Sequence, residues 1–234
     1  LAELYPDRID LGLGRAPGTD QQTLGRALRR DPRAAEAFPD DVRELEAWLS
    51  DQSPLPGVVA MPGQGTNVPL YILGSSMFGA SLAASLGLPY SFASHFAPQH
   101  LVDATTYYRE NYQPSERHPE PHVIAAVNVT AAETSEDAAR QEKIVHRNRV
   151  RAFMGRRGQV LDDAQLDAII NSFQGRQIID MMRYTARGTA DEVADYLTWF
   201  TEHAKADELM ISLQNASHGE VLAGMEILAK RWIG

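Results

Sequence analysis

Two glycine-containing turns hold the residues of this sequence that are best suited to chemistry. In the first, Arg15 follows Gly14 at the end of an apolar run, and in the second, Ser75 and Ser76 follow Gly74 at the end of another. The guanidinium of arginine matches the geometry of a phosphate. The free N–H groups and the dipole at a helix start also favour an anion. If the two runs are neighbouring strands, the turns together predict one phosphate site.

A helical pattern of small residues continues from the second turn, and its first residues are candidates for cofactor binding: Met77, Phe78 and Gly79. Gly74 permits the tight turn that precedes them. Two alternatives need no ligand at all. The serines can simply cap the helix, and Arg15 can form an ion pair with Asp10 or Asp20.

The first turn departs from the dinucleotide-binding fingerprint G-x-G-x-x-G in both spacing and context. Gly12 and Gly14 match its first two glycines, but Pro17 stands at the third and Gly18 comes one position late. The fingerprint also places an acidic residue about 20 positions further on, at the end of a second strand. This sequence has a helical pattern there, so it does not predict a nicotinamide site.

The remaining candidates for chemistry follow two other apolar runs. His95 follows the run at 90–94 and can give a proton or a hydrogen bond to a ligand, or it can bond to backbone at the strand end. Three residues after the last run are candidates for contact with a substrate: Gln214, Asn215 and His218. The histidines lack the spacing of a helical metal site, there is no cysteine, and no serine lies in G-x-S-x-G. Metal, thiol and serine-hydrolase chemistry are therefore not expected.

The composition limits the partners and the location that we expect. With 22 basic and 31 acidic residues, the net charge is −9, which argues against a nucleic acid or an anionic membrane as partner. The first residues do not resemble a signal peptide, and no apolar run is long enough for a bilayer, so we expect a cytoplasmic protein. From Gln52 to Val102 the chain has no Asp, Glu, Lys or Arg. Such a stretch is typical either of a pocket for a polar ligand or of the centre of a well-covered sheet.

Short apolar runs alternate with helical patterns along the chain, and this alternation predicts a parallel α/β fold. Strands are predicted at 9–14, 69–73, 90–94, 122–129 and 208–213. Helices are predicted at 20–30, 39–50, 76–86, 98–112, 134–153, 162–173, 175–184, 190–204 and 217–232. Residues 130–188 place several helices before the next strand and predict an insertion. We expect its basic patch at 146–157 to form a solvated helix face.

Several of these stretches resemble the bacterial luciferase-like flavin-dependent monooxygenases and oxidoreductases. The resemblance covers nearly the whole chain and is most specific in "ILGSSMFGASLAASLGLPYSFASHF" at 72–96; "YPDRIDLGLGRAPGTD" at 5–20 also carries it. It implies a (β/α)8 TIM barrel with an insertion before the last strand. It also implies that residues 1–234 form a single barrel domain whose first strand is the fourth of eight, with the N-terminal strands missing from this chain.

The same resemblance implies reduced FMN as the cofactor, with its phosphate at the Gly74 turn and Arg15 nearby. O2 and a small organic molecule would be the substrates, a separate flavin reductase would supply the reduced FMN, and the protein would be a homodimer. Two alternatives stay open: a deazaflavin (F420)-dependent hydride-transfer enzyme, and a flavin-binding protein without turnover. Luciferase itself carries a carboxylate at the position of Ser75 and a reactive cysteine at that of Gly14, so this sequence departs from it at both.

Overall fold

The computed structural model describes residues 1–15, 35–155 and 160–232. The helix expected at 20–30, the alternative partner Asp20 and the end of the basic patch at 156–157 lie outside these ranges. The described chain divides into two compact units. Unit 1 comprises Leu1–Ser91 and Asp103–His122, and unit 2 comprises Phe92–Val102 and Val123–Gly234.

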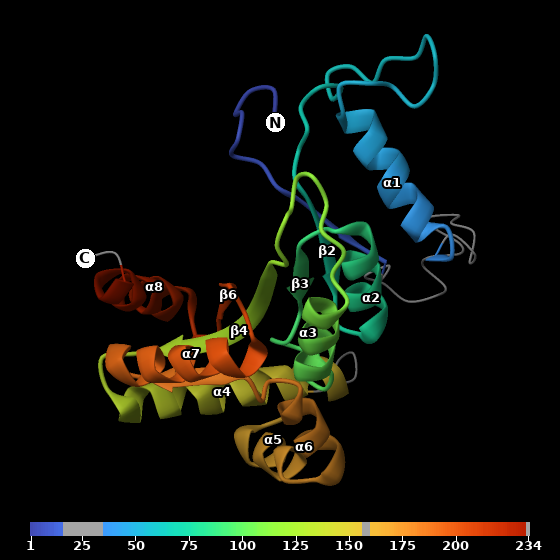
Figure 1. Ribbon diagram of the computed structural model, residues 1–234. Helices are drawn as coiled ribbons and strands as arrows, with labels where there is room; N and C mark the ends of the chain where they lie inside the picture. The colour runs from blue at the N-terminus through green and yellow to red at the C-terminus, as the bar shows by residue number, and fades with distance from the viewer. Residues whose placement is uncertain (16–34, 156–159, 233–234) are drawn as a thin grey trace. The chain divides into compact units, whose positions relative to one another are not determined.

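Unit 1 is built on two parallel strands. Strand β1 (Leu11–Gly14) pairs with β2 (Leu70–Gly74), and the register sets Gly14 beside Leu73. Helix α1 (Phe38–Leu49) precedes β2, and α2 (Met77–Leu86) follows it. Strand β3 (Tyr90–Phe92) begins in this unit, and α3 (Leu101–Glu110) ends in it. Four small residues of α2 are buried, namely Gly79, Ala80, Ala83 and Ala84, so this helix packs closely on β2 (Figure 1).

Unit 2 is organised around β4 (Val123–Ala131), a strand whose nine residues are all buried. Strands β5 (Thr185–Gly188) and β6 (Glu208–Leu213) both pair with it in parallel. Because Asn128 and Val129 have partners in both strands, β5 and β6 must flank opposite edges of β4. Helices α4 (Ser135–Met154), α7 (Ala190–Ala204) and α8 (His218–Trp232) pack on β4.

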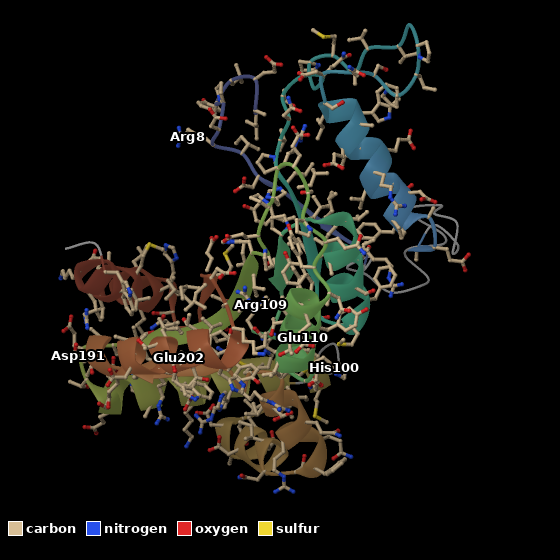
Figure 2. The ribbon with its side chains drawn as sticks, in the orientation of Figure 1. Arg8, His100, Arg109, Glu110, Asp191 and Glu202 are labelled. Carbon is tan, nitrogen blue, oxygen red and sulfur yellow. The ribbon has the colours of Figure 1, made fainter. Side chains whose placement is uncertain are left out.

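Helix α7 shows how sequence pattern decides which face is buried. Val193, Leu197 and Phe200 recur at helical spacing and are buried, as expected of an amphipathic helix. Asp191 and Glu202 lie on its exposed side (Figure 2).

In the described part of the chain, no helix is both long and apolar enough to cross a membrane.

The predicted strands and parallel pairing are confirmed, with ends that shift by at most two residues. The two further helices of unit 2, α5 (Asp163–Ile170) and α6 (Phe173–Asp180), lie before the last strand, as the predicted insertion requires. The prediction missed β5, so the described residues contain six strands rather than five. Its four residues, TARG, include a charge and a glycine, and they pair only with the last four residues of β4.

Candidate functional site

In the turn between β2 and α2, Gly74 and Gly79 lie close together. A Cβ atom added to Gly74 would lie 3.5 Å from the Cα atom of Gly79, and 3.4 Å from the hydroxyl of Tyr90. The Tyr90 hydroxyl also donates to the carbonyl of Ser76 at 3.1 Å. Burial raises the pKa of this phenol above its ordinary value, so it keeps the proton that it donates. The two glycines and Tyr90 thus hold the helix start against the strand end.

The serines of this turn do not cap the helix through their side chains as one alternative supposed. Ser76 is the N-cap residue of α2 in an extended conformation, but its side chain makes no capping hydrogen bond. The first turn of α2 also contains no acidic residue. The first N–H groups of a helix have no partner within it, so the start of α2 keeps its preference for an anion. Met77 and Phe78 are exposed there, whereas Gly79 is buried.

Arg15 lies beside this helix start. It follows Gly14, which is in register with Leu73 on the neighbouring strand. The two turns therefore follow neighbouring strands, as a single phosphate site requires. Its guanidinium carbon is 3.9 Å from the centre of the Phe78 ring, a distance typical of a cation–π contact. Arg15 therefore contacts the aromatic ring of α2 instead of forming an ion pair with Asp10.

A second group of polar residues lies at the carboxyl ends of β4 and β6 in unit 2. The register sets Asn128 beside Ser212, and the alternation of a strand places Thr130 on the same face as Asn128. Thr130 Oγ1 donates to the carbonyl of Gln214 at 2.7 Å, and the Gln214 side chain donates to Ser212 Oγ at 2.9 Å. Two hydrogen bonds, one from β4 and one to β6, therefore fix Gln214 at this edge.

His95 lies next to Asn128 in the same unit. Asn128 Nδ2 donates to the His95 carbonyl at 2.7 Å. Both His95 Nδ1 and Asn128 Oδ1 are buried without a hydrogen-bond partner among the described residues. Burial, helped by the charge of Arg149, lowers the pKa of His95 below its ordinary value, so the imidazole is neutral at pH 7. Nδ1 therefore makes no bond to backbone among the described residues.

Asn128 was missed by the sequence analysis, although a signal was present. It is a polar residue in the middle of the otherwise apolar run "VIAAVNV". A strand buried on both faces is normally continuous in apolar residues. A buried amide there must form hydrogen bonds, because loss of its hydration otherwise destabilises the fold. A polar residue in such a strand is therefore a candidate binding residue.

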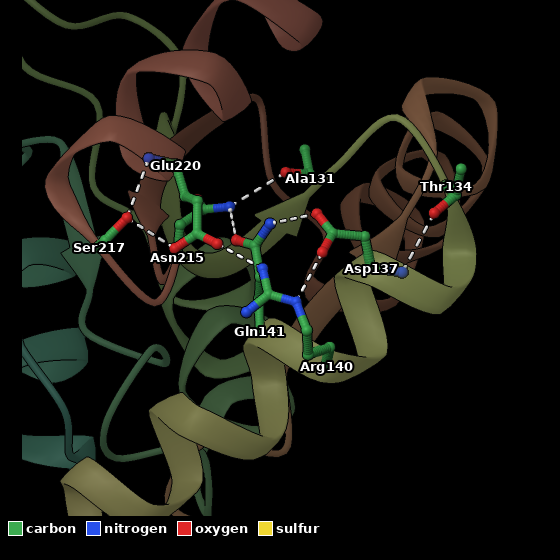
Figure 3. A network of polar contacts seen from close by, with 8 residues as sticks. All are labelled: Ala131, Thr134, Asp137, Arg140, Gln141, Asn215, Ser217 and Glu220. Atoms are coloured by element: carbon green, nitrogen blue, oxygen red, sulfur yellow. Dashed lines mark hydrogen bonds and ion pairs between the residues drawn. The ribbon is translucent and has the colours of Figure 1, made fainter.

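Asn215 has a structural role that Figure 3 shows. Its Nδ2 atom donates to the Ala131 carbonyl at 3.0 Å and to Gln141 Oε1 at 2.8 Å. Gln141 in turn donates to Asp137 at 2.8 Å. These bonds tie the segment after β6 to β4 and α4. His218, the first residue of α8, is exposed and takes no part in the hydrogen bonds that hold Gln214.

The parallel strands, with helices between them and packed against them, define an α/β protein, and comparison with known proteins identifies the family. The sequence profile of luciferase-like monooxygenases matches residues 1–219. The chain belongs to this family, so the resemblance is confirmed, and its fold is that of the luciferase-like (β/α)8 barrels. Family membership supports an oxidoreductase of the monooxygenase class.

Individual relatives agree with this assignment. The chain is 37% identical over 234 residues to the uncharacterized protein YvbT of Bacillus subtilis (strain 168), covering 99% of this chain and 69% of the relative. It is 36% identical over 228 residues to a luciferase-like monooxygenase of Escherichia coli (strain K12), covering 97% and 68%. The crystal structure of apo-MsnO8 matches with a TM-score of 0.79 at 30% identity, covering 99% of this chain and 70% of that one.

The same fold also occurs with another cofactor. An F420-dependent secondary alcohol dehydrogenase in complex with an F420–acetone adduct matches with a TM-score of 0.60 at 15% identity, over 98% of this chain and 70% of that one. At that identity the likeness shows the fold alone. This neighbour therefore does not decide between FMN and F420 for this chain.

Proposed function

We propose that this protein is a monooxygenase that uses reduced FMN and O2 to oxygenate a small organic substrate. The observation that carries the proposal is the start of α2, where uncapped N–H groups and the cation of Arg15 lie side by side on a luciferase-like fold. A compact phosphate is the group that such a site favours.

The residues of unit 1 fit the FMN phosphate. The N–H groups at Met77, Phe78 and Gly79 would hold its oxygens, and Arg15 would balance its charge. Gly74 lets the helix start lie close to β2, and Ser75 and Ser76 offer hydroxyl groups at the same turn. Reduced FMN, when bound, supplies the two electrons by which one atom of O2 enters the substrate and the other leaves as water.

The residues of unit 2 fit the substrate side. Neutral His95 is suited to hold or pass a single proton at Nδ1, and Gln214 offers an amide fixed by Ser212. Neither residue carries a formal charge at pH 7, so both favour an uncharged substrate. His218 remains a weaker candidate, because it is exposed and outside this hydrogen-bonded group.

The proposal includes two partners besides the substrate. A separate flavin reductase supplies reduced FMN, because the glycine turns do not form a nicotinamide fingerprint. A second copy of the chain forms a homodimer, as the resemblance to the family implies. Light scattering at micromolar concentration tests the dimer, and a monomer would contradict it.

Oxygen uptake tests the activity. Chemically reduced FMN is mixed with the protein and a panel of small apolar and carbonyl compounds, and O2 consumption and oxygenated products are measured. We expect one compound class to gain oxygen from 18O2 only when both protein and reduced FMN are present. Oxidation of reduced F420 coupled to hydride transfer, with no 18O in any product, would contradict the proposal.

A further inference from the structure

His95 and Asn128 each carry one buried polar atom without a partner among the described residues, and a hydrogen bond from the Asn128 side chain to the backbone carbonyl of His95 joins the two residues. Asn128 is fully buried, and its Oδ1 atom has no partner among the described residues. The His95 ring is half-buried, and its Nδ1 atom is buried and equally without a partner there. A buried polar atom without a hydrogen bond is costly, so two on adjacent residues indicate a place for a ligand.

The chemistry of each atom follows from its neighbours. The His95 carbonyl can only accept, so the atom of the Asn128 amide that faces it must be Nδ2. Oδ1 is therefore the free atom, and it needs a donor. His95 is neutral because burial and Arg149 oppose its charging, so its Nδ1 atom can carry a hydrogen and donate. The pair thus presents one acceptor and one donor.

We propose that His95 and Asn128 bind a secondary amide of the substrate, with the amide N–H on Asn128 Oδ1 and the amide carbonyl on His95 Nδ1. This inference names the substrate class of the site in unit 2 and rests on the proposed function. An amide offers one donor and one acceptor, which is the complement of the pair. A carboxylate offers acceptors only, and Asn128 Oδ1 would repel it even though Arg149 would attract it.

Small amides in the absence of flavin test this inference on the full chain. The probe is N-methylacetamide, compared with N,N-dimethylacetamide, which lacks the N–H, and with acetate. Binding is followed by NMR through the side-chain amide of Asn128 and the ring of His95, assigned with the variants Asn128→Leu and His95→Phe. We expect saturable shifts with N-methylacetamide, and affinity at least about fivefold weaker for the other two probes, because each leaves a buried atom unpaired.

The variants separate recognition from folding. Asn128→Leu keeps the branching of the side chain but removes its polar atoms and should abolish the preference for N-methylacetamide, and His95→Phe should weaken it. Thr201→Val in α7 is the matched control, since its hydroxyl donates to the Leu197 carbonyl within the helix, and it should keep the preference. If Asn128→Leu does not fold, His95→Phe alone decides.

Three results would overturn the inference. They are the absence of a saturable shift with N-methylacetamide, equal binding of the two amides or of acetate, and a preference that survives in both variants. FMN binding is measured separately by flavin fluorescence, so failure of the flavin proposal and failure of the amide proposal are distinguishable.

Discussion

Arg15 lies against Phe78, with its guanidinium carbon 3.9 Å from the centre of the ring. This contact joins the end of β1 to the first turn of α2. A ring orients the guanidinium without neutralising it, so the contact with Phe78 itself leaves the positive charge available to an anion. This contact explains how Arg15, which follows β1, can act at the start of α2, which follows β2.

Replacement of Arg15 by alanine should weaken FMN binding by about 10- to 100-fold, because a charge-assisted hydrogen bond contributes about 1.5–3 kcal/mol. Riboflavin has no phosphate, so its affinity should not change. Quenching of flavin fluorescence measures both affinities. Arg8→Ala is the matched control, because Arg8 also lies over a ring, that of Tyr5 at 5.8 Å, on a segment before β1 (Figure 2). An equal loss for riboflavin and FMN would show that Arg15 does not contact the phosphate.

Gly74→Val should reduce both stability and FMN affinity. A Cβ atom there is already in van der Waals contact with the Tyr90 hydroxyl at 3.4 Å and the Cα atom of Gly79 at 3.5 Å, so the two further methyl groups of valine would push α2 away from β2. Such overpacking costs about 1–3 kcal/mol of unfolding free energy. We expect a loss of FMN affinity at least as large as that of Arg15→Ala. Urea unfolding and flavin titration measure the two effects.

Ser76→Ala provides the contrast to Gly74→Val. The Ser76 side chain makes no capping bond, so the unfolding free energy should change by less than about 0.5 kcal/mol. FMN affinity should fall less than in Arg15→Ala, since the backbone N–H groups remain. A stability loss near the 1 kcal/mol that is typical of a lost N-cap would mean that the serine is a cap after all.

Gly175→Ala should destabilise the α5–α6 region. A Cβ atom at Gly175 would lie 1.9 Å from the carbonyl oxygen of Ile169, so the backbone must move, at a cost of about 1–3 kcal/mol or more. Gly219→Ala in α8 is the control, because a Cβ atom there meets nothing within 4 Å. We expect that control to be neutral or stabilising. Similar unfolding curves for the two variants would contradict this description of α5 and α6.

Stability should fall as the pH drops from 7 to 5. Burial is the main cause that lowers the pKa of His95, His118 and His146 below the ordinary value of 6.5. The unfolded chain therefore binds protons below about pH 6.5 that the folded chain does not, and stability rises with pH through this window and levels off above it. Thermal unfolding at pH 5, 6 and 7 measures the effect.

Substitution of His146 tests whether the buried histidines cause this fall in stability with pH. His146→Gln should flatten the fall between pH 7 and 5. The carboxylate of Asp167, whose pKa Arg147 and Lys143 lower to about 2, acts in a different range. It stabilises the fold above its unfolded value of 3.8, and that contribution is lost as the pH falls toward 2. Stability that stays constant or rises from pH 7 to 5 would contradict the assignment of the histidines.

The elements that the sequence predicted well are those with a long, regular pattern. Helix α7 was predicted at its observed ends because Val193 and Phe200 follow helical spacing. Strand β5 was missed because four residues with Arg187 and Gly188 have no strand pattern, and only pairing with β4 makes them a strand. The same limit applies to the site. Arg15 and Gly74 were found from local turns, whereas the contact between Arg15 and Phe78 and the pairing of His95 with Asn128 depend on segments distant in sequence.

A flavin titration of the purified protein tests the proposed FMN site directly. FMN and F420 are added in separate experiments, and binding is followed by their fluorescence. We expect saturable binding of one FMN per chain, at least about tenfold tighter than F420, a difference of about 1.4 kcal/mol. Tighter binding of F420, or no saturable binding of FMN, would contradict it.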